Sequence, residues 1–342
     1  MTDLVRHTIA PLTIGLSIAV SLAVAARVLA STLMVNEVAI AVMGGLVIAN
    51  ATPVGTGAAP GVAFATRQLL RAGIVLLGAQ LSFAAVLTAG LSALGLVVAL
   101  VFVTLVGILL AARALRLDPR LGLLVAVGTA ICGNTAILAT APIVKARGRD
   151  VSVAVATITL FGTAAVFVYP ALGLLLDLDP KLFGVWAGTA VNDTSQVVAA
   201  GFAYGEEAGQ VATVVKLTRN TLLAPVLVLV VVWCARRSDG AEASRGSAAR
   251  LREALPLFVL GFLAMALLNT LGVLDASPLG GRLPHVLADA GRFLVLVALA
   301  GVGLSTRLRP LREVGVRPIG LGLAGGVLLS ALSLGTLTLM DV

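Results

Sequence analysis

Two stretches of small and polar residues interrupt otherwise apolar segments of this chain, and they share a pattern. Residues 128–135 are Gly-Thr-Ala-Ile-Cys-Gly-Asn-Thr, and residues 188–194 are Gly-Thr-Ala-Val-Asn-Asp-Thr. A break in a membrane helix frees backbone N–H and C=O groups, which can hold an anion or a cation such as Na⁺. The two stretches are therefore candidates for a joint binding site for a substrate and its coupling ion.

The polar side chains of these stretches are the candidate ligands. A carboxylate at bilayer depth is unfavourable unless it is paired or wet, so Asp193 is the strongest indication of function. For any single Gly, Ser or Thr, close helix packing is the alternative interpretation. We assign the coupling-ion site, including any Na⁺, to Asp193, Asn134 and Asn192. The candidate substrate ligands are Gly133, Asn134, Thr135, Asn192, Thr194, Ser195 and Gln196.

Two basic residues follow on the segment 209–235. Lys216 and Arg219 are three residues apart and therefore share a helix face. They could balance the charge of Asp193, bind an anionic substrate, or extend to the membrane surface. Pro225 is expected to kink the same helix.

A second basic pair, Arg67 and Arg71, also has helical spacing. We interpret this pair as a cytoplasmic anchor rather than as substrate ligands. The Gly- and Pro-rich stretch just before it, residues 52–61, is expected to form a loop or an unwound element.

The composition places all these residues in a membrane protein. Of the 342 residues, 59% are hydrophobic and only 12% are charged, whereas about a quarter of the residues in a soluble domain are charged. The two cysteines and two histidines are too few for a structural zinc site. No basic stretch is interleaved with aromatic residues, so nucleic-acid binding is not expected despite the net charge of +8.

The fold class expected is all-α, with about 9–11 membrane spans, since apolar windows of roughly 20 residues recur along the chain. Two further segments, 121–146 and 183–203, are apolar but broken by the polar stretches. We expect one transmembrane transporter domain over 1–342, with inverted-repeat halves at about 1–174 and 183–342 and a linker at 236–252. The continuous spans are expected at about 8–30, 38–51, 68–88, 90–112, 151–174, 209–235, 253–274, 288–306 and 316–339.

Loop charges predict the orientation of the chain. Basic residues cluster near Arg6 and within 113–120, 145–149, 236–252 and 307–317. The positive-inside rule places these loops and the N-terminus in the cytoplasm of a bacterial cell, with the chain in the inner membrane. Both ends of 121–146 then lie on one side and both ends of 183–203 on the other. Each broken segment is thus a re-entrant hairpin or, in the competing topology, a discontinuous helix that crosses the membrane.

Several further motifs occur along the chain: Arg71–Gly78, Ile131–Gly133, Thr157–Gly162 with Tyr169-Pro170, Phe183-Gly184 with Trp186–Gly188, Gln196–Gly201, and Lys216–Arg219 with Ala224-Pro225. Together they resemble the YeiH family of sulfate exporters, and the resemblance covers nearly the whole chain. It implies membership of a superfamily with sodium/proton antiporters and bile-acid-type symporters, and an inverted-repeat fold with discontinuous helices. Many members have a His-Glu pair before the Gln-Val-Val run, where this chain has Asn192–Ser195.

These observations predict a secondary active transporter of a small, sulfate- or sulfonate-like anion. Coupling to Na⁺ or H⁺ and alternating access at the two breaks are expected. Its partners would be that anion and the lipid bilayer, and a homodimer is compatible with the sequence. No cofactor is expected. The alternative is a cation/proton antiporter in which Asp193 exchanges Na⁺ for H⁺. An enzyme is not expected, because no nucleophile–base pair is evident.

Overall fold

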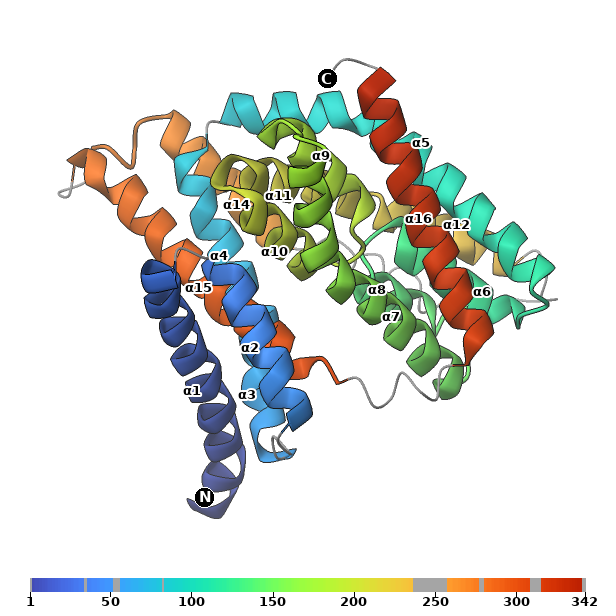
Figure 1. Ribbon diagram of the computed structural model, residues 1–342, viewed down its shortest axis with the longest axis horizontal. Helices are drawn as coiled ribbons and strands as arrows, with labels where there is room; N and C mark the ends of the chain where they lie inside the picture. The colour runs from blue at the N-terminus through green and yellow to red at the C-terminus, as the bar shows by residue number, and fades with distance from the viewer. Residues whose placement is uncertain are drawn as a thin grey trace. The chain divides into compact units, whose positions relative to one another are not determined.

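The computed structural model describes residues 2–33, 36–51, 56–81, 83–235, 257–276, 280–307 and 315–339. The described residues form helices joined by short turns, which confirms the all-α class (Figure 1). Seven of the helices are long and apolar enough to cross a membrane. Three shorter apolar helices accompany them, at Glu37–Ala51, Pro119–Ala130 and Leu257–Thr270. The chain is therefore a multi-pass membrane protein.

Most candidate spans coincide with the predicted ones, but the span predicted at 68–88 was wrong. Part of that window lies in a span over Ala59–Gln80, and a new helix, α5 (Phe83–Ala114), follows it. The loop predicted at 52–61 ends earlier than expected, since Pro60 occupies the first turn of α3 (Ala59–Phe64). Proline is well tolerated there, because that N–H has no intrahelical partner. The other long spans are Pro11–Thr32, Ala93–Ala114, Gly148–Leu175, Glu206–Cys234, Leu283–Ser305 and Val316–Leu339.

The chain divides into two compact units, each built from two separate stretches. The first comprises Met1–Thr88 and Leu257–Leu308, and the second comprises Ala89–Pro256 and Arg309–Val342. The linker predicted at 236–252 lies outside the described residues, and the inverted-repeat halves remain a prediction.

In the first unit, pairs of glycines bring helices close together. A Cβ on any of these glycines would overlap the backbone of its partner helix, and small residues at helix crossings are typical of membrane proteins. The pairs are Gly15 of α1 (Thr2–Leu33) with Gly61 of α3, Gly45 of α2 (Glu37–Ala51) with Gly303 of α15 (Leu283–Ser305), and Gly73 of α4 (Leu70–Leu77) with Gly291 of α15. Helix α14 (Leu257–Thr270) packs against α4.

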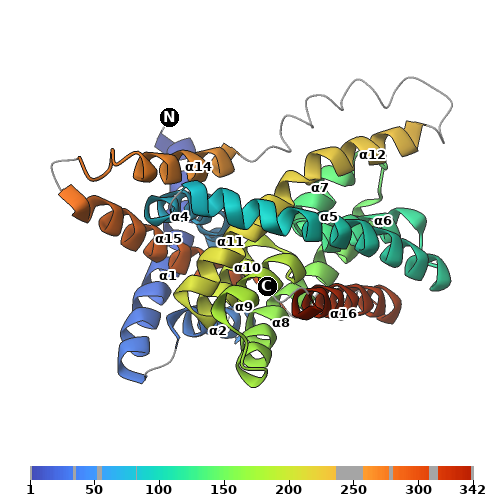
Figure 2. The same ribbon diagram turned by 90° about the horizontal axis from the view of Figure 1, so that it is seen from above.

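The second unit contains both interrupted segments. The first consists of α6 (Pro119–Ala130) and α7 (Asn134–Thr140), and the second of α9 (Pro180–Ala190) and α10 (Thr194–Tyr204). Helix α8 (Gly148–Leu175) contacts α6, α7 and α10, whereas α11 (Glu206–Thr221) packs against α9 and α10 (Figure 2). Helix α12 (Leu223–Ala235) follows α11 after a break at Leu222, close to the interruption expected at Pro225.

Both interrupted segments are re-entrant hairpins. In the first, Nη1 of Arg120 at the start of α6 donates a 3.1 Å hydrogen bond to the carbonyl of Lys145, beyond the end of α7. In the second, Nζ of Lys181 lies 3.7 Å from Oε1 of Glu207, so the start of α9 is beside the end of α10. Each segment enters and leaves at one end, and the topology with crossing helices is wrong.

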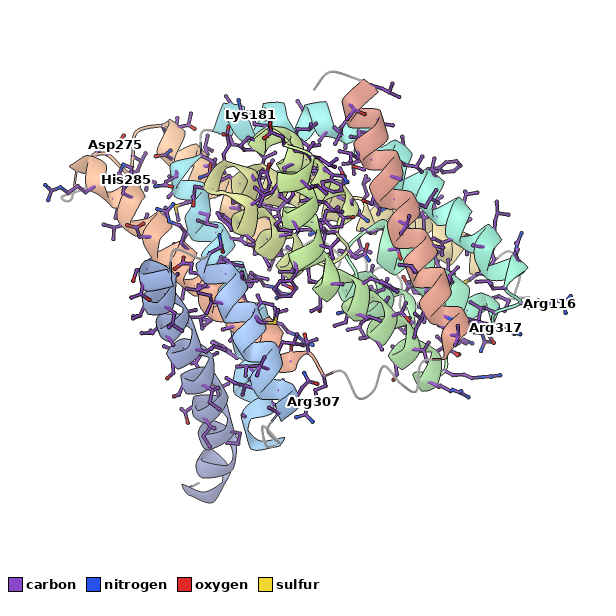
Figure 3. The ribbon with its side chains drawn as sticks, viewed as in Figure 1. Arg116, Lys181, Asp275, His285, Arg307 and Arg317 are labelled. Atoms are coloured by element: carbon purple, nitrogen blue, oxygen red, sulfur yellow. The ribbon has the colours of Figure 1, made fainter. Side chains whose placement is uncertain are left out.

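Helix α8 places the two hairpin openings on opposite sides. The first opening lies just before Gly148 and the second just after Leu175, and α8 connects them with 28 residues. At 1.5 Å per residue this length is about 42 Å, which exceeds the apolar thickness of a bilayer. In Figure 3, Arg116 and Arg317 lie at one end of this unit and Lys181 at the other.

A group of aromatic rings fixes the second hairpin against α8 and α16 (Val316–Leu339). Phe183 stacks on Tyr204 across the hairpin, with ring centroids 3.9 Å apart. Trp186 stacks on Tyr169 of α8 at 4.4 Å and donates a 3.1 Å hydrogen bond from Nε1 to the carbonyl of Ser330. Buried aromatic pairs stabilise a fold beyond their area alone, so this hairpin is held as a folded element.

The hairpin topology predicts the sidedness of labelling in sealed vesicles. In a background with Cys132→Ser and Cys234→Ser, Arg116→Cys and Arg147→Cys should react with an impermeant thiol reagent from the same side. Lys181→Cys should react from the other side, because α8 separates the two openings. Reaction of Arg116→Cys and Arg147→Cys from opposite sides would mean that 121–146 crosses the membrane.

Candidate functional site

The tip of the first hairpin depends on Gly133. Helix α6 ends at Ala130, and α7 begins at Asn134. Between them Gly133 has φ 61° and ψ −126°, a conformation that residues with a side chain rarely adopt. The glycine of the Ile-Cys-Gly motif is therefore required by the backbone of the turn, whatever its role toward a ligand.

The tip of the second hairpin is capped by Asp193. Its Oδ1 accepts hydrogen bonds from the backbone N–H of Ser195 at 3.1 Å and from the Ser195 hydroxyl at 2.8 Å. Asp193 is thus the N-cap of α10, where a carboxylate satisfies free N–H groups and faces the positive end of the helix dipole. Within the described part of the chain, its Oδ2 accepts no hydrogen bond and remains available to a ligand.

The two tips meet at these two residues. A Cβ built on Gly133 would lie 3.2 Å from both Cβ and Oδ2 of Asp193. Because Gly133 precedes α7 and Asp193 precedes α10, the N-termini of both helices converge at this contact. The structure therefore confirms the predicted approach of residues 128–135 and 188–196.

Lys216 of α11 bridges the two tips by donating hydrogen bonds to both hairpins. Its ammonium group donates to the carbonyl of Ile131 at 2.8 Å in the first hairpin. In the second hairpin it donates to the carbonyls of Val191 at 3.0 Å and Asn192 at 2.5 Å. The side chain is completely buried, with 0% of its surface exposed.

Arg219, one turn further along α11, makes the same kind of bridge. Its Nε donates to Ala130 at 2.7 Å and its Nη2 to Thr129, both in the first hairpin. Its Nη1 donates to the carbonyl of Thr189 in the second hairpin at 2.5 Å, and also reaches Val191 at 3.3 Å. Thr129 and Thr189 occupy the same place in the repeated Gly-Thr-Ala pattern. The guanidinium of Arg219 therefore binds equivalent carbonyls in the two repeats.

The acceptors of both cations are carbonyls in and just after the last turns of α6 and α9. Helix C-termini leave carbonyls unpaired and carry the negative end of the dipole, so cations are stabilising there. The interpretation that Lys216 and Arg219 extend to the surface was wrong, since both are buried. No ion pair joins either of them to Asp193 among the described residues. Their charges instead balance the ends of two helices.

The other predicted ligands lie around the tips, and some of them form hydrogen bonds to neighbouring helices rather than to one another. Asn134 donates from Nδ2 to the hydroxyl of Thr159 on α8 at 3.1 Å. Thr194 accepts at its hydroxyl from Nδ2 of Asn220 on α11, also at 3.1 Å. Thr135 is exposed on α7.

Four amide groups near the tips retain a buried oxygen without a hydrogen-bond partner among the described residues. The atoms are Oδ1 of Asn134, Asn192 and Asn220, and Oε1 of Gln196, whose amide rests on Gly162 of α8. Since buried polar atoms are normally paired, these oxygens are candidates for contact with an ion, a substrate or water.

Two contributors to this site were missed by sequence reasoning. Asn220 follows Arg219 directly and lies four residues after Lys216, which places it on the same helix face. That spacing was a usable signal. Thr159 lies in the motif at 157–162, but nothing in the motif shows that it faces Asn134.

The fold and this site define a multi-pass membrane protein with two opposed re-entrant hairpins joined at their tips. The family model described as "Conserved hypothetical protein 698" matches residues 14–322. The chain belongs to this family, and the resemblance to YeiH-type proteins is confirmed.

Individual relatives are similar over most of their length. The chain is 37% identical over 321 residues to the UPF0324 membrane protein TauZ of Paracoccus denitrificans, covering 92% of each. It is 37% identical over 295 residues to the UPF0324 membrane protein PA5383 of Pseudomonas aeruginosa, covering 83% of this chain and 81% of that one. It is 34% identical over 331 residues to the UPF0324 membrane protein OB3406 of Oceanobacillus iheyensis, covering 96% and 95%. No solved structure matches.

Removing either buried cation should destabilise the protein. Lys216→Met removes three hydrogen bonds to backbone carbonyls and Arg219→Met removes four, with the carbonyl of Val191 shared between the two side chains. One buried unsatisfied group costs about 1–3 kcal/mol, so we expect a loss of about 3 kcal/mol or more in the free energy of unfolding. The measurement is the thermal denaturation midpoint of the purified protein in detergent. Lys181→Met, at a side chain that is 74% exposed, is the control and should leave the midpoint unchanged. A wild-type midpoint for both buried variants would contradict the structural role.

Gly133→Ala should also lower the midpoint. The backbone conformation at Gly133 costs a residue with a side chain about 1–3 kcal/mol, and the added methyl group would press on Asp193. Gly326→Ala in α16 is the matched control, since its Cβ would meet nothing within 4 Å. An unchanged midpoint for Gly133→Ala would show that the turn has another conformation.

Proposed function

We propose that this protein is a secondary active transporter of a small anion, such as sulfate or a sulfonate, coupled to Na⁺ or H⁺ by alternating access. The observation that carries the proposal is the contact of Gly133 with Asp193, where two hairpins from opposite sides meet. Non-helical backbone at bilayer depth is stable only when it is buried in protein or lines a water-filled cavity. Converging helix termini at such a depth are the arrangement with which many transporters hold substrate and ion.

The charges around the tips support an anionic substrate. The joined tips hold two buried cations, Lys216 and Arg219, and one carboxylate, Asp193, so the formal charge of the three side chains is positive. Both cations bind the carbonyl ends of α6 and α9. The negative ends of these helices are thereby offset, while the positive N-terminal end of α10 is directed toward the tip contact. A positive potential in a site of low dielectric raises the local concentration of anions.

A coupling cation is supported by the oxygen atoms at the same place. Asp193 offers Oδ2, and Asn134 and Asn192 each offer a buried amide oxygen without a partner among the described residues. Oxygen ligands of this type suit Na⁺, and the carboxylate could take up a proton instead. These atoms also favour the second candidate function, a cation/proton antiporter, in which the same set would bind Na⁺ and no anion would be moved.

Asp193→Asn separates these functions. Asparagine caps helices as well as aspartate does, so the change removes the charge and retains the cap of α10. In proteoliposomes the wild type should accumulate radiolabelled sulfate when a Na⁺ or pH gradient is imposed. Asp193→Asn should abolish this gradient-driven uptake and leave sulfate–sulfate exchange in place.

The matched control is Asp179→Asn, which alters the N-cap of α9 at the opening of the same hairpin, where Oδ1 accepts from the N–H of Lys181. It should transport as the wild type does. Full gradient-driven uptake by Asp193→Asn would refute the assignment of the coupling site. Na⁺-dependent proton movement by the wild type that no anion stimulates would establish the antiporter instead.

A further inference from the structure

Two arginines lie at the middle of a membrane-spanning helix in the first unit. The span Ala59–Gln80 consists of α3, the π-helical turn Ala65–Leu69, α4 and a final 3₁₀ turn. Arg67 is about 12 Å from its start and Arg71 about 13 Å from its end, at 1.5 Å per residue. The interpretation of this pair as a cytoplasmic anchor was therefore wrong. It rested on a span at 68–88, which would have put both residues at its edge.

The packing of this helix on α15 also places Arg71 near the middle of the membrane-spanning segments. A Cβ on Gly73 would lie 2.8 Å from the carbonyl oxygen of Gly291 and from a methyl carbon of Val295. Both partners are near the middle of the span Leu283–Ser305. Arg71 is only two residues from Gly73, so it lies at the level of the centre of α15.

The arginines share the exposed face of this helix with Gln68. The buried positions, which pack within the unit, include Gly61, Val62, Ala65, Leu70, Gly73, Ile74 and Leu77. The exposed positions recur at helical spacing and are Ala59, Pro60, Ala63, Phe64, Arg67, Gln68, Arg71 and Ala72. A polar group of three side chains thus occupies the centre of one face, with apolar residues on either side along the helix.

Local structure holds this group in place. Arg67 and Gln68 are part of the π-helical turn Ala65–Leu69, a feature that is rare in proteins and frequent at functional sites. The guanidinium of Arg71 lies over the ring of Phe258 on α14, 5.8 Å from the ring centroid. No carboxylate pairs with Arg67 or Arg71 in the part of the chain that the structure describes.

Two guanidinium groups at the centre of a bilayer, without a carboxylate partner among the described residues, are strongly unfavourable against lipid. Their face of the helix must therefore meet water, a ligand or both. The geometry points to a second anion site, in which Arg67, Gln68 and Arg71 bind a small tetrahedral oxyanion. Guanidinium groups suit this ligand, since their planar N–H forks bind oxyanions with paired hydrogen bonds. The inference rests on the proposed anion transport and assigns it a set of ligands outside the hairpin tips.

The first experiment measures sulfate–sulfate exchange in proteoliposomes, which requires no coupling gradient. Arg67→Gln and Arg71→Gln should each raise the KM for sulfate roughly tenfold or more, as expected for the loss of one charge-assisted contact. Arg67→Lys and Arg71→Lys should lie between these variants and the wild type. Arg282→Gln, which alters an exposed arginine at the N-cap of α15, is the matched control and should keep the wild-type KM.

The second experiment does not depend on transport. In the background with Cys132→Ser and Cys234→Ser, Gln68→Cys should react with a charged methanethiosulfonate reagent, and sulfate should slow this reaction. Val24→Cys, at an exposed apolar position of α1, should react far more slowly. If Gln68→Cys does not react, or reacts at a rate that sulfate leaves unchanged, the anion site is overturned.

The two proposals fail in different ways. Exchange of sulfate with an unchanged KM in all four variants of Arg67 and Arg71 would leave the proposed transport standing and overturn the second anion site. A wild-type protein that moves no anion under any gradient would overturn the proposed transport. In that case protection of Gln68→Cys by sulfate still decides whether these arginines bind an oxyanion.

Discussion

Lys216 and Arg219 join the two hairpins by donating hydrogen bonds to backbone carbonyls on both of them. These bonds stabilise the polar backbone at the depth where each hairpin turns. Without them, the carbonyl ends of α6 and α9 would lie in a low-dielectric interior without donors. The same bonds provide acceptors for two buried charges. The free carbonyls and the cations therefore stabilise one another, and neither would be stable there alone.

This mutual dependence limits how the protein can move. Separation of the tips would strip both cations of their acceptors at once, so the hairpins and α11 should move as one body. The aromatic contacts of Trp186 and the hydrogen bond between Thr189 and Ser333 extend that body to α16. Conformational change is then expected to displace this assembly as a whole, and the Gly133–Asp193 contact should persist through it.

The sequence was sufficient for the fold class, for most spans and for the meeting of the two polar stretches. Apolar length and loop charge are properties of side chains, so they can be read directly. The acceptors of Lys216 and Arg219 are backbone carbonyls, which no residue type reveals. The start of the span at Ala59 was missed because Pro60 and Gly61 are typical of loops. In this structure Pro60 lies in the first turn of a helix, and Gly61 lies where α3 crosses α1.

The central arginines of the span Ala59–Gln80 also bear on how the protein reaches its mature state. This span has a mean hydropathy of 1.3, the lowest of the seven candidate spans. A segment with two charges at its centre partitions poorly into lipid by itself. Helix α1 is made before it and offers Gly15 as a packing partner, whereas α15, which contacts Gly73, is made much later. We therefore expect biogenesis to be sequential. The segment would be held beside α1 at the translocon during synthesis and would become stably integrated only when α15 emerges.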